Sequence, residues 1–175
     1  MAEEMAEKMT KKMDEISQKT AMQWIFSSEK ETDLWARTLA KWLQNLAITD
    51  CKIYLEGQLG AGKTAFSRHF IQALGVKGAI KSPTYTLIEP YELPALMVLH
   101  ADLYRLASPV ELFDLGLLEE SGIWLIEWPE KGAGVLPEAD IVLKLSRVSE
   151  ELTVNSEART PLGQQLMAKV AEDWQ

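Results

Sequence analysis

The sequence predicts an α/β protein: a three-layer sandwich with a mainly parallel central sheet and added antiparallel strands. Three observations support this prediction. Residues 57–64 read GQLGAGKT, a complete G-x-x-x-x-G-K-[ST] phosphate-loop motif. Apolar strand-like runs alternate with amphipathic segments over residues 22–174. The 175 residues are 47% hydrophobic and 25% charged, as in a globular protein with a sizeable core. Together these features indicate a P-loop NTPase-like sandwich.

The first half of the chain predicts two strand–helix pairs. Residues 22–26 form a short apolar run, and Ser28, followed three residues later by glutamate, resembles a capping box for a helix to about residue 46. Residues 51–56 predict a buried strand that runs directly into the phosphate loop. An amphipathic helix then covers residues 65–74. Strand, loop and helix in this order are the context that the motif requires.

The second half repeats this alternation. Residues 82–88 begin as a loop at a proline and become strand-like. Ser108 precedes a proline, and a glutamate completes a capping box, so a helix is predicted to about residue 118. Further apolar runs predict strands at residues 95–101, 122–127, 141–145 and 152–155, the last two as a hairpin, and a terminal helix at residues 161–174.

Residues 1–20 stand apart from this pattern, and we expect residues 21–175 to form a single P-loop nucleotide-binding domain. Methionines recur at Met1, Met5, Met9 and Met13 and would make a thin apolar stripe on a helix. This stripe suits either a docking helix or a flexible, weakly helical extension. We expect the extension, because isolated helices of this length are marginal in water.

Composition narrows the classes of protein. The chain has 26 acidic and 18 basic residues, a net charge of −8, which disfavours a protein that grips nucleic acid by itself. Cys51 is the only cysteine, so the sequence contains neither an internal disulfide nor a cysteine zinc site. No apolar run reaches the roughly 18 residues of a membrane span, and the charged start is unlike a signal peptide. We therefore expect a cytoplasmic protein without a membrane partner.

The phosphate loop predicts a nucleotide site. Its glycines let backbone N–H groups turn toward a phosphate, and the following helix presents its positive end to the same anion. Lys63 is predicted to reach the β- and γ-phosphates and to act in catalysis, and the Thr64 hydroxyl to bind Mg²⁺. The predicted binding residues of this segment are Gly57, Gln58, Leu59, Gly60, Ala61, Gly62, Lys63, Thr64 and Ala65.

Two acids follow apolar strands, where ligands gather in such folds. Asp102 ends one run and Glu127 ends the other. Both are predicted as catalytic and metal-binding residues, with either one holding Mg²⁺ while the other positions water. Ser82 and Thr84 lie in a loop that suits sensing of the γ-phosphate or, alternatively, an ordinary turn. Trp128 suits core packing or a lid over the nucleotide.

Four segments in this order resemble one family. They are LGAGKT at residues 59–64, SPTYTL at 82–87, DLYRL at 102–106 and EWP at 127–129. Over about residues 22–170 the chain is similar to the bacterial TsaE (YjeE) family. The resemblance implies an ATPase of threonylcarbamoyladenosine tRNA modification that works with TsaB and TsaD. It also implies that hydrolysis resets this complex and that tRNA is contacted indirectly, through the partners.

The resemblance also implies roles for particular residues. Lys63 and Thr64 match its phosphate and Mg²⁺ residues, and Asp102 and Glu127 match its essential acids. Two positions depart from the common pattern, because Gln58 replaces an acid and alanine follows Thr64 where threonine is frequent. Ser82 and Thr84 match the family's switch-like loop, and Trp128 matches its tryptophan beside the acid.

Three rival functions use the same loop. A small-molecule kinase would need a second substrate pocket, usually under an arginine-rich lid, and no such segment stands out. A GTPase would carry an Asn-Lys-x-Asp motif to read guanine, which the sequence lacks. A non-enzymatic nucleotide-binding adaptor does not explain two acids at strand ends. We therefore expect ATP or ADP with Mg²⁺ as the bound cofactors.

Overall fold

The computed structural model describes residues 1, 3–8 and 21–174. Residues 3–8 are helical, and Met9 and Met13 of the predicted methionine stripe lie outside the described residues. The strands are β1 (Ala21–Phe26), β2 (Cys51–Glu56), β3 (Ile88–Glu92), β4 (Met97–Asp102), β5 (Ile123–Glu127), β6 (Ile141–Val148) and β7 (Glu151–Ala158). The longer helices are α2 (Glu29–Asn45), α3 (Lys63–Ala73) and α4 (Pro161–Asp173).

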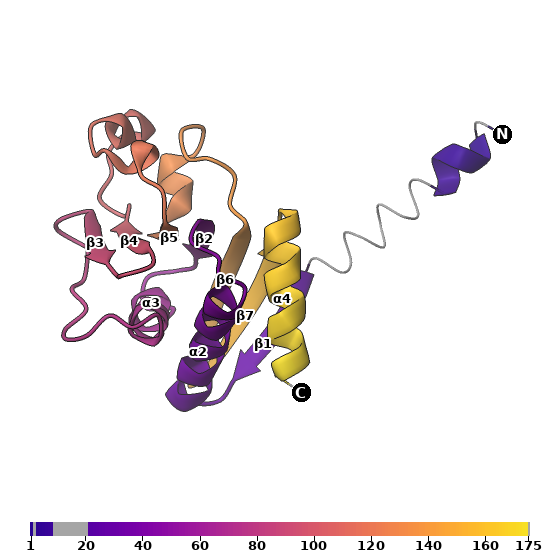
Figure 1. Cartoon of the computed structure of the whole chain (residues 1–175), viewed down its shortest axis with the longest axis horizontal. Coiled ribbons are helices and arrows are strands. Elements are labelled where there is room, and N and C mark those ends of the chain that lie inside the picture. Colours follow the sequence, from indigo (N-terminus) through magenta and orange to yellow (C-terminus); the bar gives the residue numbers. More distant parts are fainter. Residues whose placement is uncertain (2, 9–20, 175) are drawn as a thin grey trace.

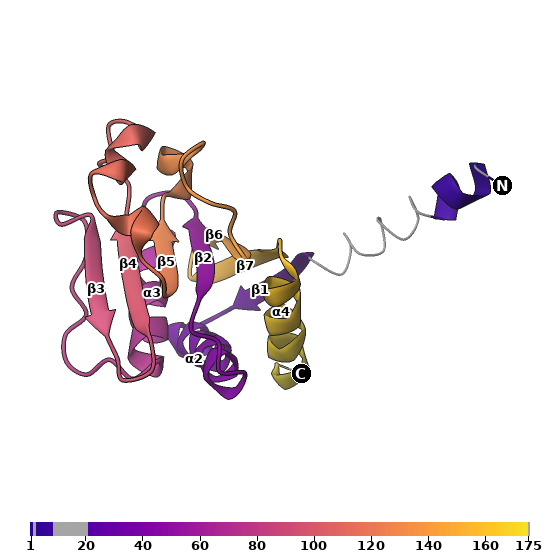
Figure 2. The same cartoon turned by 45° about the horizontal axis from the view of Figure 1, so that its top comes forward.

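The strands form one sheet in the order β1-β7-β6-β2-β5-β4-β3 (Figures 1 and 2). The central strands β6, β2, β5 and β4 run parallel to one another. Antiparallel pairs join β3 to β4, β7 to β6 and β1 to β7. The predicted α/β fold, with a parallel centre and added antiparallel strands, is confirmed.

Three helices cover one face of the sheet, with α2 lying between α3 and α4 (Figure 2). The capping box at the start of α2 forms as predicted, because the Ser28 hydroxyl accepts from the Glu31 N–H and the Glu31 carboxylate accepts from the Ser27 N–H. Trp35 on α2 is fully buried, and its ring centroid lies 5.4 Å from that of Trp24. Aromatic packing of this kind fixes the helices on the sheet.

The opposite face is covered by short 3₁₀ turns and loops around a second apolar cluster. The turns are η1 (Pro109–Phe113), η2 (Leu117–Glu119) and η3 (Pro129–Gly132). The helix predicted over residues 108–118 is therefore wrong, although the capping box at Ser108 is present. Gly116, at φ +71°, separates η1 from η2, and a right-handed helix cannot pass through that conformation.

The strand-like character predicted within residues 82–88 begins later in the structure. Residues 83–86 form turns, and the Leu87 N–H donates to the Pro83 carbonyl at 2.8 Å. Leu87 itself has φ +64°, so the chain becomes extended only at Ile88. β3 is an edge strand and contains Pro90, which is tolerated there because an edge strand needs fewer ladder donors.

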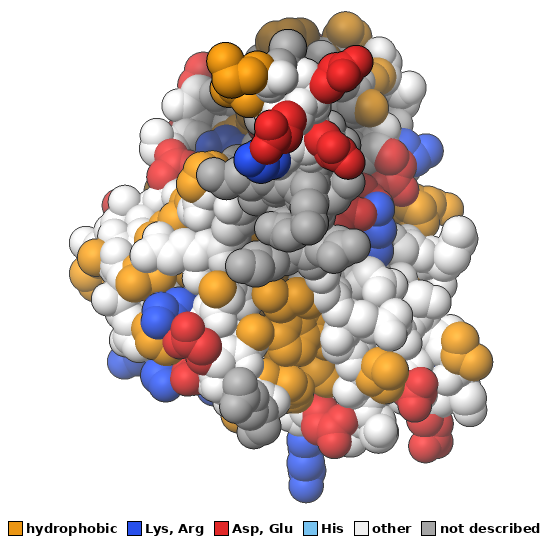
Figure 3. All heavy atoms as spheres, turned by 90° about the vertical axis from the view of Figure 1, so that its right-hand side faces the viewer, with side chains coloured by type: hydrophobic (Ala, Val, Ile, Leu, Met, Phe, Trp, Pro, Cys, Tyr) orange, Lys and Arg blue, Asp and Glu red, His pale blue; other side chains and the backbone are white. Residues whose placement is uncertain are grey.

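Figure 3 views the molecule from the side of α4 and β1, where hydrophobic side chains gather in a strip near the middle of the face. Within the described part of the chain, every helix is too short or too polar to cross a membrane.

Candidate functional site

The phosphate loop joins β2 to α3 at the carboxyl end of the sheet. Gly57, Gly60 and Gly62 all have positive φ angles, of +152°, +78° and +108°. Gly57 also lies against β6, since a Cβ placed on it would come within 2.5 Å of the Leu145 carbonyl oxygen. The loop thus needs glycine here both for its conformation and for close packing on the neighbouring strand.

Lys63 lies on the inner side of this loop. Its Nζ donates to the carbonyl oxygens of Gly57, at 2.6 Å, and Gln58, at 2.9 Å. The same nitrogen lies 4.2 Å from the centre of the Trp128 ring, within cation–π range. Burial lowers the pKa of Lys63, and the nearby carboxylate of Glu127 opposes this shift. The loop and the indole therefore enclose a cation on both sides.

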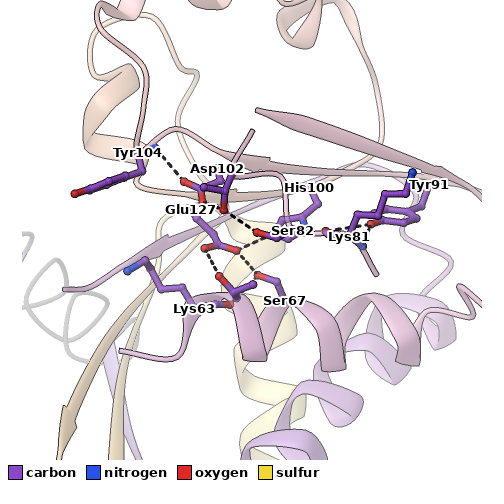
Figure 4. A network of polar contacts seen from close by, with 11 residues as sticks. Lys63, Ser67, Lys81, Ser82, Tyr91, His100, Asp102, Tyr104 and Glu127 are labelled. Atoms are coloured by element: carbon purple, nitrogen blue, oxygen red, sulfur yellow. Dashed lines mark hydrogen bonds and ion pairs between the residues drawn. The ribbon is translucent and has the colours of Figure 1, made fainter. Parts of the chain in front are cut away.

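Sheet register brings the two predicted acids together. β4 and β5 are parallel neighbours, and Asp102 lies directly opposite Glu127 at the ends of both strands. Because side chains alternate along a strand, His100 shares the face of Asp102. All three side chains point from the sheet toward α3 (Figure 4). The separate acid-ended runs of the sequence thus converge on the phosphate loop.

Glu127 is almost fully buried and accepts several hydrogen bonds. The Thr64 hydroxyl donates to its Oε2 at 3.0 Å. Its Oε1 lies 2.8 Å from His100 Nε2 and 3.2 Å from Ser67 Oγ (Figure 4). The carboxylate is therefore tied both to the phosphate-loop helix and to β4, which fixes its position relative to Thr64.

Asp102 has a different environment. Its Oδ1 accepts from the Tyr104 N–H at 3.0 Å, and the Thr84 hydroxyl lies 3.5 Å from its Oδ2. Burial raises the pKa of Asp102, and the charge of Glu127 acts in the same direction. The hydrogen bond from Tyr104 partly opposes that rise. A carboxyl group with a raised pKa is better suited to accept a proton than an ordinary aspartate.

The loop around Ser82 and Thr84 reaches this site through one of its two hydroxyls. Ser82 Oγ lies 2.7 Å from Thr84 Oγ1, and only Thr84 contacts Asp102. Arg105 was expected in a surface ion pair, but its guanidinium instead lies 4.5 Å from the centre of the Tyr85 ring. Trp128 packs against Tyr104 with ring centroids 4.9 Å apart. These side chains form the rim of the site.

Two cavities adjoin the phosphate loop. The smaller, of about 330 Å³, is lined by Lys63, Thr64, Thr84, Asp102 and Glu127. The larger, of about 800 Å³, lies between the loop and the end of β6. Between them the two cavities include every predicted binding residue of the phosphate loop, and Trp128 lines both. Ser82 lines neither cavity.

The smaller cavity suits a magnesium ion bound together with phosphate. Mg²⁺ prefers oxygen ligands and is usually held by one or two carboxylates plus phosphate oxygens and water. The Thr64 hydroxyl and the Glu127 carboxylate are such ligands and lie together in this cavity, with Asp102 on the adjacent strand. Among residues 1, 3–8 and 21–174 no group of three or more His, Cys, Asp or Glu could hold a metal by itself. The donors therefore fit a nucleotide-linked Mg²⁺.

Sequence reasoning missed two residues of this network. His100 was expected to be an ordinary core histidine, yet it contacts Glu127 while its Nδ1 has no partner in the described part of the chain. Its place two residues before Asp102 on one strand was the available signal. Ser67, one turn after Lys63 on α3, also contacts Glu127.

Comparison with known proteins gives concordant results. Residues 26–158 match the family described as threonylcarbamoyl adenosine biosynthesis protein TsaE. The chain is 44% identical over 119 residues to the tRNA threonylcarbamoyladenosine biosynthesis protein TsaE of Haemophilus influenzae, covering 66% of this chain and 75% of the relative. It is 32% identical over 133 residues to the Bacillus subtilis protein of the same name, covering 74% and 80%. The crystal structure of Bacillus subtilis YdiB superposes with a TM-score of 0.69 at 25% identity, over 87% of this chain and 95% of that one.

Proposed function

Because the chain belongs to the TsaE family, we propose that it acts in tRNA threonylcarbamoyladenosine biosynthesis as a Mg²⁺-dependent ATPase in the cytoplasm. In this proposal it works with TsaB and TsaD, meets tRNA indirectly through them, and resets their complex by hydrolysing ATP. One observation carries the enzymatic part. The Thr64 hydroxyl of the phosphate loop and the Glu127 carboxylate at the end of β5 lie 3.0 Å apart.

Each group has a proposed task in hydrolysis. Lys63 binds the β- and γ-phosphates from inside the loop, and its positive charge stabilises the charge that develops on them. Mg²⁺ supplies further charge neutralisation when bound, and Thr64 with Glu127 would hold it. Glu127 is assigned to the metal because it shares a hydrogen bond with Thr64. Asp102 is assigned to the attacking water, because its raised pKa favours proton acceptance.

The hydrolytic role is tested by measuring ATP turnover with purified TsaB and TsaD present. We expect Lys63→Ala to lose nucleotide binding or turnover. Glu127→Gln and Asp102→Asn should bind ATP but hydrolyse it at least about a hundredfold more slowly, the scale of general acid–base catalysis. Wild-type rates in both acid variants would contradict the proposal, and a phosphorylated small molecule as product would indicate a kinase instead.

The division of labour between the acids needs a second measurement. Titration of turnover with Mg²⁺ should show a higher half-saturating concentration for Glu127→Gln and an unchanged one for Asp102→Asn. The reverse pattern would exchange the two roles.

The assembly role is tested separately, by capture of TsaB and TsaD on the immobilised protein with and without ATP. We expect association to depend on nucleotide. If no association is detected under either condition, the proposed role in the complex fails even if ATP binding survives.

A further inference from the structure

The larger cavity next to the phosphate loop has no task in the hydrolytic mechanism. It lies on the β6 side of the loop, whereas the smaller cavity lies on the side of β4 and β5. Leu59, Gly60 and Trp128 line both cavities, so the two spaces meet at this rim. A ligand bound at the smaller cavity can therefore extend past the loop into the larger one.

The two cavities differ in chemistry. The smaller one contains the groups that suit phosphate and metal, above all Lys63 and Glu127. The larger one combines backbone of the loop with Ser146, an apolar wall at Leu145, and charged side chains of both signs. Its volume of about 800 Å³ is within the usual range for small-molecule sites, about 300–1,000 Å³. A mixed apolar and polar surface of this size suits a neutral, hydrogen-bonding group better than it suits phosphate.

Arg147 lies where the two cavities approach each other. Its Nη2 is 3.4 Å from the point that a Cβ on Gly62 would occupy, so the guanidinium lies beside the start of α3. Its Nη1 donates to the Glu150 carbonyl at 3.3 Å, and none of the described carboxylates pairs with it. By contrast, Lys144 on the same strand is paired with Glu157. Arg147 is thus a cation held by the backbone and available to a phosphate or to the face of a base.

We propose that the larger cavity is the nucleoside subsite, which receives the base and ribose of the bound nucleotide, with Arg147 beside the phosphate chain. This inference rests on the proposed nucleotide function and adds the β6–β7 hairpin to the binding site. The phosphates occupy the smaller cavity, cross the rim at Leu59 and Gly60, and leave the nucleoside against Ser146 on the other side. The wall is firm because β6 and β7 pair along their full length.

The test is to fill the cavity without touching the phosphate loop. Ser146 is exposed on β6 and lines the cavity, so Ser146→Trp introduces an indole into the space of the nucleoside. Val148, on the same strand and 74% exposed, does not line the cavity, so Val148→Trp is the matched control. Binding of ATP, ADP and inorganic tripolyphosphate, each with Mg²⁺, is measured by calorimetry on the full chain. Thermal melting confirms that each variant is folded.

We expect Ser146→Trp to raise the Kd for ATP and ADP by about tenfold or more, a loss of about 1.4 kcal/mol, and to leave the Kd for tripolyphosphate within about twofold. Val148→Trp should change none of the three. Arg147→Ala, which removes a side chain rather than adding one, should also weaken ATP and ADP.

Three results would overturn the inference. One is unchanged ATP affinity in both Ser146→Trp and Arg147→Ala. Another is an equal loss for tripolyphosphate and ATP in Ser146→Trp, and the third is an equal effect of Val148→Trp. Failure of the wild-type protein to bind ATP would instead reject the proposed function, and failure to hydrolyse it would leave this binding comparison intact.

Discussion

Gly57→Ala isolates the packing that holds the phosphate loop on the sheet. Gly57 has φ +152°, and an added Cβ would lie 2.5 Å from the Leu145 carbonyl oxygen, whereas real Cβ contacts essentially never fall below 3.0 Å. The obstacle is backbone rather than a flexible side chain. Leu145 belongs to β6 and is paired with Val154 of β7, so it cannot move without disturbing the hairpin.

Two costs add in this variant. A residue with a side chain at a backbone conformation reserved for glycine costs about 1–3 kcal/mol. Forcing a methyl group into a packed contact costs about 1–3 kcal/mol more. We therefore expect Gly57→Ala to lower the free energy of unfolding by about 2–6 kcal/mol. If the loop shifts to relieve the clash, part of this cost is replaced by weaker ATP binding.

Gly60→Ala is the matched control. Gly60 also has a positive φ, of +78°, but a Cβ there meets nothing within 4 Å. It should lose only the conformational cost, about 1–2 kcal/mol. Urea denaturation and ATP titration of both variants provide the measurement. Equal losses of stability and affinity in the two variants, or a Gly57→Ala protein indistinguishable from wild type, would refute the reasoning.

Three further predictions concern buried and paired groups. His100→Leu removes the contact at 2.8 Å to Glu127, so turnover should fall while ATP affinity without Mg²⁺ is kept, and His100→Gln should recover part of the rate; equal rates for Leu and Gln would argue for packing alone. Hydrogen bonding to Lys144 lowers the pKa of Glu157, so this carboxylate stabilises the fold above its ordinary pKa of 4.5 and the benefit disappears as the pH falls through the lowered value. Glu157→Gln should thus cost no more than about 1 kcal/mol at neutral pH and nothing in acid, as read from denaturation curves at each pH. Cys51 is fully buried and burial raises its thiol pKa, so iodoacetamide should label it only after unfolding; rapid labelling of the native protein would contradict its placement.

The strands of the central sheet could be predicted because each carries its own local signal. The apolar runs before Asp102 and Glu127 correspond to β4 and β5. Local signals were weaker guides on the second face of the sheet. The Ser108 capping box forms as the sequence indicates, yet it leads into a 3₁₀ turn, because Gly116 takes a left-handed conformation and apolar packing against the sheet replaces the rest of the helix.

The sequence by itself determined the phosphate loop, since its fixed residues follow one another and their turn is a local property of glycine. It also determined that carboxylates end two buried strands. Only the tertiary structure decided that β5 lies between β2 and β4, which brings Glu127 to Thr64 and opposite Asp102. Strand order depends on pairing between segments far apart in the chain, and such pairing leaves no mark within any one segment. For the same reason the contact of His100 with Glu127, and the approach of Arg147 to the loop, appear only in the folded protein.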